Sequence, residues 1–334
     1  MKLKIIAEAG QGFEGKYSLA KKLLYAATKA NSDTIKYQLV FADEICTEDY
    51  SHYKFFKSLE LKDNEWNSIK KIAQKNKIEL QFDIFGTQSL RLCEKLKIKT
   101  VKIHPTDINN RKLLISLKNS KIRNIILGVG GASYNEIIFA LKILKSKKII
   151  LMFGFQGYPT PINANQLSRL KLIKPKLLKR YKNVVYGFAD HEPSKSLLRY
   201  MVPAVATGIG FQYIEKHITL KTKRKLEDSE SAFDPEEFKI FSKTLRESFL
   251  SIGSSKDNNF FSMSKEELNY RNKIRRHVIT TKSLKKGKII RYEHLALKRS
   301  SEKNPLRNID QVVGKKLKRT LSINSVLKKN LISS

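Results

Sequence analysis

Residues 124–153 have the sequence NIILGVGGASYNEIIFALKILKSKKIILMF, in which two short apolar segments flank a longer amphipathic one. The segments 124–128 and 149–153 are rich in isoleucine, a β-branched residue, which is typical of buried strands. Between them, residues 134–146 place apolar side chains at the three- and four-residue spacing of a helix with one buried side. This stretch therefore predicts a strand, a helix and a second strand in succession.

The same alternation continues on both sides of this stretch. Helical spacing recurs at 18–30, 64–76 and 196–208, and another helix is expected after Asp234 as N-cap and Pro235 at the first position. Eight alternations within about 250 residues favour a closed parallel (β/α)8 barrel, because a doubly wound sheet usually has fewer strands. The predicted strands are 4–9, 34–38, 78–84, 100–104, 124–128, 149–153, 184–189 and 213–217.

A change of composition marks the end of the predicted barrel. Residues 253–272 are mostly polar, and we expect a linker over 253–275. Beyond it, apolar and polar residues alternate around a turn at Lys286 and Gly287, which predicts a small β-rich module. The expected domains are therefore a catalytic barrel at 1–252, the linker, and a C-terminal module at 276–334.

The net charge of +35 is extreme and predicts non-specific attraction of polyanions at low salt. Lysines are nevertheless spread along the whole chain, with no zinc-finger or RNA-binding signature among them, so we expect no specific nucleic-acid partner. The first residues lack the pattern of a secretory signal, and no apolar run reaches the roughly 18 residues that span a bilayer. We therefore expect a cytoplasmic protein with no membrane partner.

Polar residues at the ends of the predicted strands are the candidates for chemistry. In a barrel of this type, the carboxyl ends of the strands and the loops after them form the active face. We expect the side chains found there to converge on one site. They are Glu8, Lys36, Gln38, Lys102, Asp107, Tyr158, Asp190, His191, Glu215 and His217.

Two pairs among these residues have specific chemistry. His191 and His217, at the ends of adjacent strands, are candidates to share a divalent cation, although each is alternatively a hydrogen-bonded loop histidine. Lys36 and Lys102 lie within apolar strand segments and are candidates to neutralise phosphate or carboxylate, or to form a Schiff base; surface charge is the alternative. By contrast, we expect three histidines on the surface, namely His52, His277 and His294.

Five barrel motifs, in the same order and with matching spacing, and two motifs of the C-terminal module resemble those of one enzyme family. The resemblance is to the sialic acid synthase family in the barrel and to its antifreeze-like (SAF) domain at the end of the chain. The barrel motifs are IIAEAGQGFEG (5–15), TIKYQ (34–38), YPTP (158–161), GFADH (187–191) and IEKHIT (214–219), and the module motifs are VITTKSLKKGKII (278–290) and LALKR (295–299).

This resemblance implies an activity. The family condenses phosphoenolpyruvate with an N-acetylated hexosamine aldehyde, forming a nine-carbon 2-keto sugar acid and releasing phosphate. His191 and His217 would then hold Mn²⁺ or Mg²⁺ as cofactor, and Arg299 would reach the sugar across a domain-swapped homodimer. The implied catalytic residues are Glu8, Lys36, Lys102 and Asp107, and the implied substrate-binding residues are Gln38, Gln156, Tyr158, Asp190, Asp228 and Arg299.

The chain departs from the family pattern where phosphate is bound. At positions where the family has serine or threonine, this chain has Asp83, Pro105, Gly128 and Ala189. The family's Asn two residues before the YPTP tyrosine is replaced by Gln156. An aspartate at a phosphate site adds a negative charge, which repels phosphoenolpyruvate unless the carboxyl is protonated or metal-bound. Two alternatives therefore stay open: a divergent barrel enzyme that keeps the metal and sugar pocket without using phosphoenolpyruvate, and a non-catalytic binder of a sugar or polyanion.

Overall fold

The computed structural model describes residues 3–155, 157, 160–221, 225–253 and 262–333, and the chain divides into two compact units. The first unit is Met1–Gly253 and the second is Ser254–Ser334. The segment expected as a linker contains a helix, α11 (Lys265–Ile274), which the polar composition did not suggest. Its signal is local: Ser264 accepts a hydrogen bond from the backbone of Glu267, and Glu267 accepts one from the backbone of Ser264, which is a capping box.

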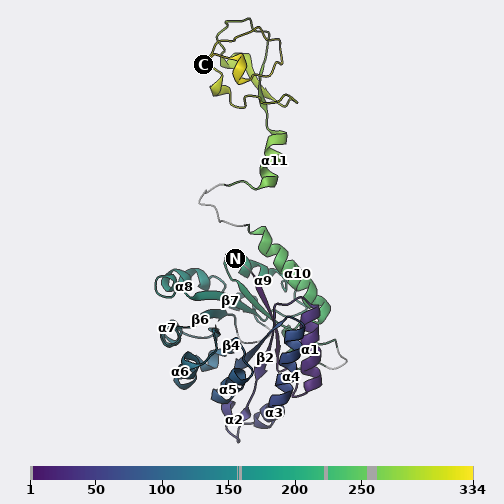
Figure 1. Ribbon diagram of the computed structural model, residues 1–334, viewed down its shortest axis with the longest axis vertical. Helices are drawn as coiled ribbons and strands as arrows, with labels where there is room; N and C mark the ends of the chain where they lie inside the picture. The colour runs from purple at the N-terminus through teal and green to yellow at the C-terminus, as the bar shows by residue number, and fades with distance from the viewer. Residues whose placement is uncertain (1–2, 156, 158–159, 222–224, 254–261, 334) are drawn as a thin grey trace. The chain divides into compact units, whose positions relative to one another are not determined.

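The first unit is a closed barrel in which every neighbouring pair of strands is parallel, with helices around the outside (Figure 1). This confirms the predicted (β/α)8 fold class, and the eight predicted strands are all present with ends shifted by at most one residue. The strands are β1 (Lys4–Gly10), β2 (Thr34–Leu39), β3 (Glu79–Ile84), β4 (Thr100–Ile103), β5 (Asn124–Gly128), β6 (Lys148–Phe153), β7 (Val184–Asp190) and β8 (Tyr213–His217).

Helices follow the strands and cover the outer face of the barrel. The predicted helix at 196–208 begins later, as α9 (Met201–Ile209), because Pro203 is tolerated only in the first turn of a helix. The expected cap of α10 (Pro235–Ser251) is confirmed, since Asp234 accepts hydrogen bonds from two first-turn amides. The others are α1 (Tyr17–Lys29), α2 (Ala42–Ile45), α3 (Tyr53–Ser58), α4 (Asp63–Lys75), α5 (Thr87–Lys95), α6 (Arg111–Asn119), α7 (Tyr134–Ile143) and α8 (Arg169–Leu178).

Between the helices and the strands lies the main apolar core, which includes a group of aromatic side chains around Trp66 of α4. The Trp66 ring makes edge contacts with Phe13 and Phe82, at centroid distances of 5.4 and 5.0 Å. Tyr37 packs beside it at 5.5 Å, and its hydroxyl donates a 2.7 Å hydrogen bond to the carbonyl of Ala20. These contacts join β2, β3, α1 and α4 into one packed unit.

Inside the barrel, side chains of alternating strand positions form layers. Five apolar side chains form a cluster inside the barrel, namely Ile6, Ile126, Ile150, Met152 and Ala189. In β1 the inward-facing position after Ile6 is Glu8, whose register partner in β8 is His217. The apolar cluster therefore lies beside charged residues, since Ile126 is the register partner of Lys102 and Ala189 that of Glu215.

The second unit is a small β module with its own apolar core. Strands β9 (His277–Thr280) and β10 (Leu295–Lys298) pair antiparallel, and isolated bridges join the rest of the chain around them. The expected turn is present, with Gly287 at φ +81°, a conformation that favours glycine. The core consists of Val278, Leu284, Ile290, Leu295, Leu306, Val312, Leu317, Leu321, Leu327, Leu331 and Ile332.

Two histidines of this module are buried, so the expectation of surface positions for them is wrong. His277 is hydrogen-bonded through Nδ1 to the hydroxyl of Ser300 at 2.8 Å. His294 accepts a 3.1 Å hydrogen bond from the backbone of Arg291. Both rings satisfy local backbone or hydroxyl groups, which spacing between histidines cannot reveal.

Throughout the described ranges, no helix combines the length and apolar character that crossing a bilayer requires.

The aromatic group gives a stability prediction. Trp66→Ala should lower the free energy of unfolding of the barrel by about 3–5 kcal/mol, because it leaves a cavity among Phe13, Tyr37 and Phe82. Urea unfolding followed by far-UV circular dichroism measures this, since Trp66 is the single tryptophan. Tyr25→Ala in α1 is the control: its side chain is 45% exposed, and the change should stay within about 0.5 kcal/mol. Equal effects of the two changes would contradict this account of the core.

Candidate active site

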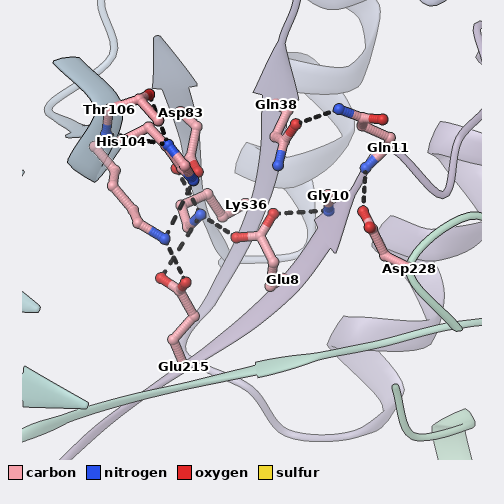
Figure 2. Close-up of polar contacts among 11 residues, drawn as sticks. Glu8, Gly10, Gln11, Lys36, Gln38, Asp83, His104, Thr106, Glu215 and Asp228 are labelled. Atoms are coloured by element: carbon pink, nitrogen blue, oxygen red, sulfur yellow. Dashed lines mark hydrogen bonds and ion pairs between the residues drawn. The ribbon is translucent and has the colours of Figure 1, made fainter. Parts of the chain in front are cut away.

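Lys36 of β2 lies inside the barrel in contact with carboxylates from three other strands (Figure 2). Its Nζ is in direct contact with Glu8 of β1, lies 2.5 Å from Oδ1 of Asp83 in β3, and lies 3.6 Å from Oε2 of Glu215 in β8. The Lys36 side chain has no exposed surface. A buried ammonium group requires such partners, because an unpaired charge in the interior is strongly unfavourable.

Lys102 of β4 completes this group of five residues, which we call the Lys36 cluster: Glu8, Lys36, Asp83, Lys102 and Glu215. The Nζ of Lys102 lies 2.6 Å from Oε1 of Glu215 and 3.6 Å from Oδ2 of Asp83. The structure thus brings together Glu8, Lys36 and Lys102, three of the four predicted catalytic residues. It also brings in Glu215, one of the strand-end residues expected to converge, and Asp83, to which the sequence reasoning had assigned no catalytic role.

Burial and charge act against one another in the Lys36 cluster. Burial raises the pKa of Glu8 to about 8, although Lys36 opposes this. Burial also acts to raise the pKa of Glu215, but attraction to Lys102 and Lys36 outweighs it and lowers that pKa to about 2. Burial lowers the pKa of Lys36, and the surrounding Asp83, Glu215 and Glu8 more than reverse this, so Lys36 stays protonated. Lys36 therefore holds a fixed positive charge at neutral pH.

The loop after β1 brings two predicted substrate-binding residues together (Figure 2). The backbone N–H of Gln11 donates to Oδ2 of Asp228 at 3.0 Å, and its side-chain amide donates to Oε1 of Gln38 at 2.7 Å. Gly10 makes this possible, because it has φ +53° and a Cβ there would lie 2.3 Å from Oδ2 of Asp228. Its N–H donates to Oε1 of Glu8 at 2.7 Å, which links this loop to the Lys36 cluster.

His191 and His217 lie side by side after β7 and at the end of β8, as the sequence predicted. Their ring centroids are 5.4 Å apart. Nδ1 of His191 lies 2.7 Å from the carbonyl oxygen of Phe155, and a proton on Nδ1 for this hydrogen bond leaves a lone pair on Nε2. Burial, followed by the neighbouring His217, lowers the pKa of His191 to about 3, and burial lowers the pKa of His217 as well. Both imidazoles are therefore neutral at pH 7.

Two neutral imidazoles side by side suit a divalent cation. Within the described ranges, no set of three or more His, Cys, Asp or Glu side chains is grouped so as to hold a metal ion. An ion between His191 and His217 would take its other ligands from water or substrate. The donor set thus fits an open catalytic metal site and does not fit a closed structural one.

Asp190, predicted to bind substrate, does not lie with these residues. It is the register partner of Lys216, whose Nζ donates a 2.7 Å hydrogen bond to its Oδ2, and both side chains are completely buried. Because successive strand residues point to opposite faces, Asp190 and Lys216 face the helices while Glu215 and His217 face the interior. The Nζ of Lys216 lies 4.8 Å from the ring centroid of Phe233, which fits this outer position. Asp190 is part of the barrel wall.

The remaining predicted site residues are found in three situations. Asp107 ends a short 3₁₀ segment (Pro105–Asp107) after β4, at the same barrel end as Lys102; burial raises its pKa, and its Oδ1 accepts a 2.9 Å hydrogen bond from Asn110. Arg299 belongs to the second unit, where it is exposed and donates to the carbonyl of Ile274 at 3.2 Å. Gln156 and Tyr158 lie outside the described residues.

Two departures from the family pattern fit one another in the structure. A Cβ on Gly128 of β5 would lie 2.6 Å from Cδ of Pro105. The proline ring therefore fills the room that a serine side chain at position 128 would need. Pro105 and Gly128 form a matched pair, whereas Asp83 belongs to the Lys36 cluster.

The comparisons with known proteins agree with this geometry. The model of the NeuB family matches residues 23–257, and that of the SAF domain matches residues 275–333. The N,N'-diacetyllegionaminic acid synthase of Legionella pneumophila is 27% identical over 344 residues, covering 97% of this chain and 92% of the relative. The pseudaminic acid synthase of Campylobacter jejuni is 25% identical over 348 residues, covering 98% and 96%.

A solved structure gives the same result. The N-acetylneuraminic acid (sialic acid) synthetase of Leptospira borgpetersenii, in complex with citrate, superimposes with a TM-score of 0.72 at 26% identity and covers 82% of this chain and 93% of that one. The resemblance drawn from the sequence motifs is therefore confirmed. With a family match over well more than half of its length, this chain belongs to the NeuB family and carries a C-terminal SAF domain.

Proposed function

We propose that this chain condenses phosphoenolpyruvate with the open-chain aldehyde of an N-acetylated hexosamine, forming a nonulosonic acid of the sialic, legionaminic or pseudaminic type. The observation that carries the proposal is the gathering of two buried lysines and two neutral histidines at the carboxyl ends of the barrel strands. The relatives named as synthases of such acids support it. A cytoplasmic location stays a prediction from the sequence.

The acceptor sugar would bind near the two histidines. His191 and His217 would hold Mn²⁺ or Mg²⁺, which, when bound, supplies a Lewis acid for the aldehyde oxygen. Asp228 and Gln38, both held by Gln11, present carboxylate and amide groups suited to sugar hydroxyls. Gln156 and Tyr158 are proposed as further sugar contacts.

The donor would bind at the lysines. Lys36 and Lys102 would meet the carboxylate and phosphate of phosphoenolpyruvate. The enol carbon forms the new bond to the aldehyde carbon, water adds to the donor carbon that carried phosphate, and inorganic phosphate leaves. The lysines would stabilise negative charge as it moves to the leaving group, and Glu8 would position the water. Asp107, whose pKa burial raises, would supply a proton to the aldehyde oxygen.

A second candidate function is favoured by one observation, the contacts of Asp83 with both lysines. In this alternative the chain keeps the metal and sugar pocket but uses a donor without phosphate. A non-catalytic sugar binder is the remaining reading, and it differs from both enzymes in showing no turnover.

The first test is release of inorganic phosphate from phosphoenolpyruvate, with a panel of N-acetylated hexosamines and Mn²⁺. We expect release that needs both the sugar and the metal, and that falls by at least about 100-fold in His191→Ala, because one of the two imidazole ligands is lost. Phe155→Ala is the comparison variant: it keeps the backbone carbonyl that orients His191, so activity should stay near that of the wild type.

Loss of metal gives an independent readout for the same site. Mn²⁺ binding, measured by calorimetry without substrates, should weaken in His191→Ala and His217→Ala. A folded wild-type protein that binds Mn²⁺ but releases no phosphate with any sugar would support the second candidate function. A protein that binds a sugar without metal and without turnover would support the non-catalytic reading.

We further propose that Arg299 contacts the sugar bound by the partner subunit of a domain-swapped homodimer. If so, mixing inactive Arg299→Ala with inactive His191→Ala should restore activity, because each mixed dimer contains one site with neither change. Random exchange of subunits gives about one quarter of the wild-type activity. No restoration, from samples shown by light scattering to exchange subunits, would place Arg299 in the site of its own chain.

A further inference from the structure

Asp83 is placed as an anionic ligand of the two lysines. It lies on β3, its Oδ1 accepts a 2.5 Å hydrogen bond from Lys36, and its Oδ2 lies 3.6 Å from Nζ of Lys102. Its side chain is 2% exposed. A carboxylate in this position makes the contacts that the proposed function assigns to the anionic groups of the donor.

Formal charge points the same way. In the Lys36 cluster two lysines face three carboxyl groups, and although burial raises the pKa of Glu8 to about 8, the carboxylates of Asp83 and Glu215 are enough to leave the lysines no surplus positive charge for an incoming anion. His104, which follows β4, does not supply it, because burial, followed by the charge of Lys102, lowers its pKa to about 4. An additional phosphate would therefore be repelled while Asp83 stays in place.

The burial of both lysines also restricts the binding of an additional anion. The Lys36 side chain has no exposed surface, and that of Lys102 is 6% exposed. An anion that contacts Lys36 has to replace one of its present carboxylate partners. Glu215 is unsuited to this, because it lies two residues before His217 on the same short strand and accepts the 2.6 Å hydrogen bond of Lys102. Asp83 contacts both lysines and lies next to the loop that follows β3.

At the amino end of α5, the helix that follows β3, a carboxylate of the chain also occupies a position that suits an anion. The amino end of α5 presents free backbone N–H groups, a usual place for an anion. Here the carboxylate of Glu44 from α2 accepts hydrogen bonds from the backbone N–H groups of Gln88 and Ser89, at 2.5 and 3.0 Å, and from the Ser89 hydroxyl at 2.8 Å. Both positions near the end of β3 that suit an anion are thus occupied by carboxylates of the chain itself.

We propose that Asp83 is a specificity-determining residue that acts as an internal competitor for the donor: it occupies the anion position between Lys36 and Lys102, and a phosphate-bearing substrate binds there only by displacing it. This inference rests on the proposed function, since it takes these lysines as the donor site. The consequence is weak binding of phosphate-bearing donors and a relative preference for donors with less negative charge.

The test measures binding of inorganic phosphate and of phosphoenolpyruvate by calorimetry, without acceptor sugar, so that it does not depend on turnover. Asp83→Asn removes the charge and keeps the shape, whereas Asp83→Thr also opens space beside Lys36. We expect both variants to bind each anion at least about tenfold more tightly than the wild type, with Asp83→Thr the tighter of the two.

Asp190→Asn is the matched control, because it also removes a buried carboxylate paired with a lysine, but on the outer face of the strands. Its affinity for phosphate should stay within about threefold of the wild-type value, since Lys216 faces away from the interior. Folded Asp83 variants that bind both anions no more tightly than the wild type would overturn the inference. Tighter binding without any phosphate release would keep the inference and reject the proposed condensation.

Discussion

The barrel interior depends on the pairing of one buried ammonium group. Lys36 has no exposed surface, so its charge is stable only if carboxylates from neighbouring strands meet it inside the barrel. Glu8, Asp83 and Glu215 come from β1, β3 and β8, and a shift of any of these strands by one residue would turn its carboxylate outward and leave Lys36 short of a partner. Removal of one partner from such a pair typically costs about 3–5 kcal/mol. The cluster therefore fixes strand register as well as the chemistry of the site.

Above this cluster, the same alternation places the histidines. Glu215 and His217 are two residues apart on β8, so they face the same interior, and the register partner of His217 is Glu8. The apolar cluster that contains Ile6 and Ile126 lies in the same interior. A single repeat, every second residue of each strand, thus places an apolar cluster, the Lys36 cluster and the two imidazoles inside the barrel.

Strand alternation also explains how much of the site could be predicted from the sequence. The eight strands and the convergence of Glu8, Lys36 and Lys102 follow from local pattern, because closing a barrel brings alternate strand positions together. Asp190 was predicted to face the site because it lies near the end of a strand. Successive strand residues point to opposite faces, so the inward-facing neighbours Ala189 and His191 leave Asp190 facing the helices. Which carboxylate meets which lysine could not be predicted, since that depends on the stagger between strands and on side chains reaching across the barrel.

Charge acts on two scales in this protein, with opposite effects on an anionic donor. The surface, with a net charge of +35, draws anions toward the chain from several ångströms away, and this raises the rate of encounter in a salt-dependent manner. Within the barrel, Asp83 and Glu215 of the Lys36 cluster balance the two lysines and leave no surplus of positive charge that would hold such an anion. Long-range attraction changes association rates more than affinity, so it does not compensate for a balanced binding site. The substrate preference of this chain is therefore set by Asp83 and its two lysines, and the basic surface alone cannot make it a tight binder of phosphoenolpyruvate.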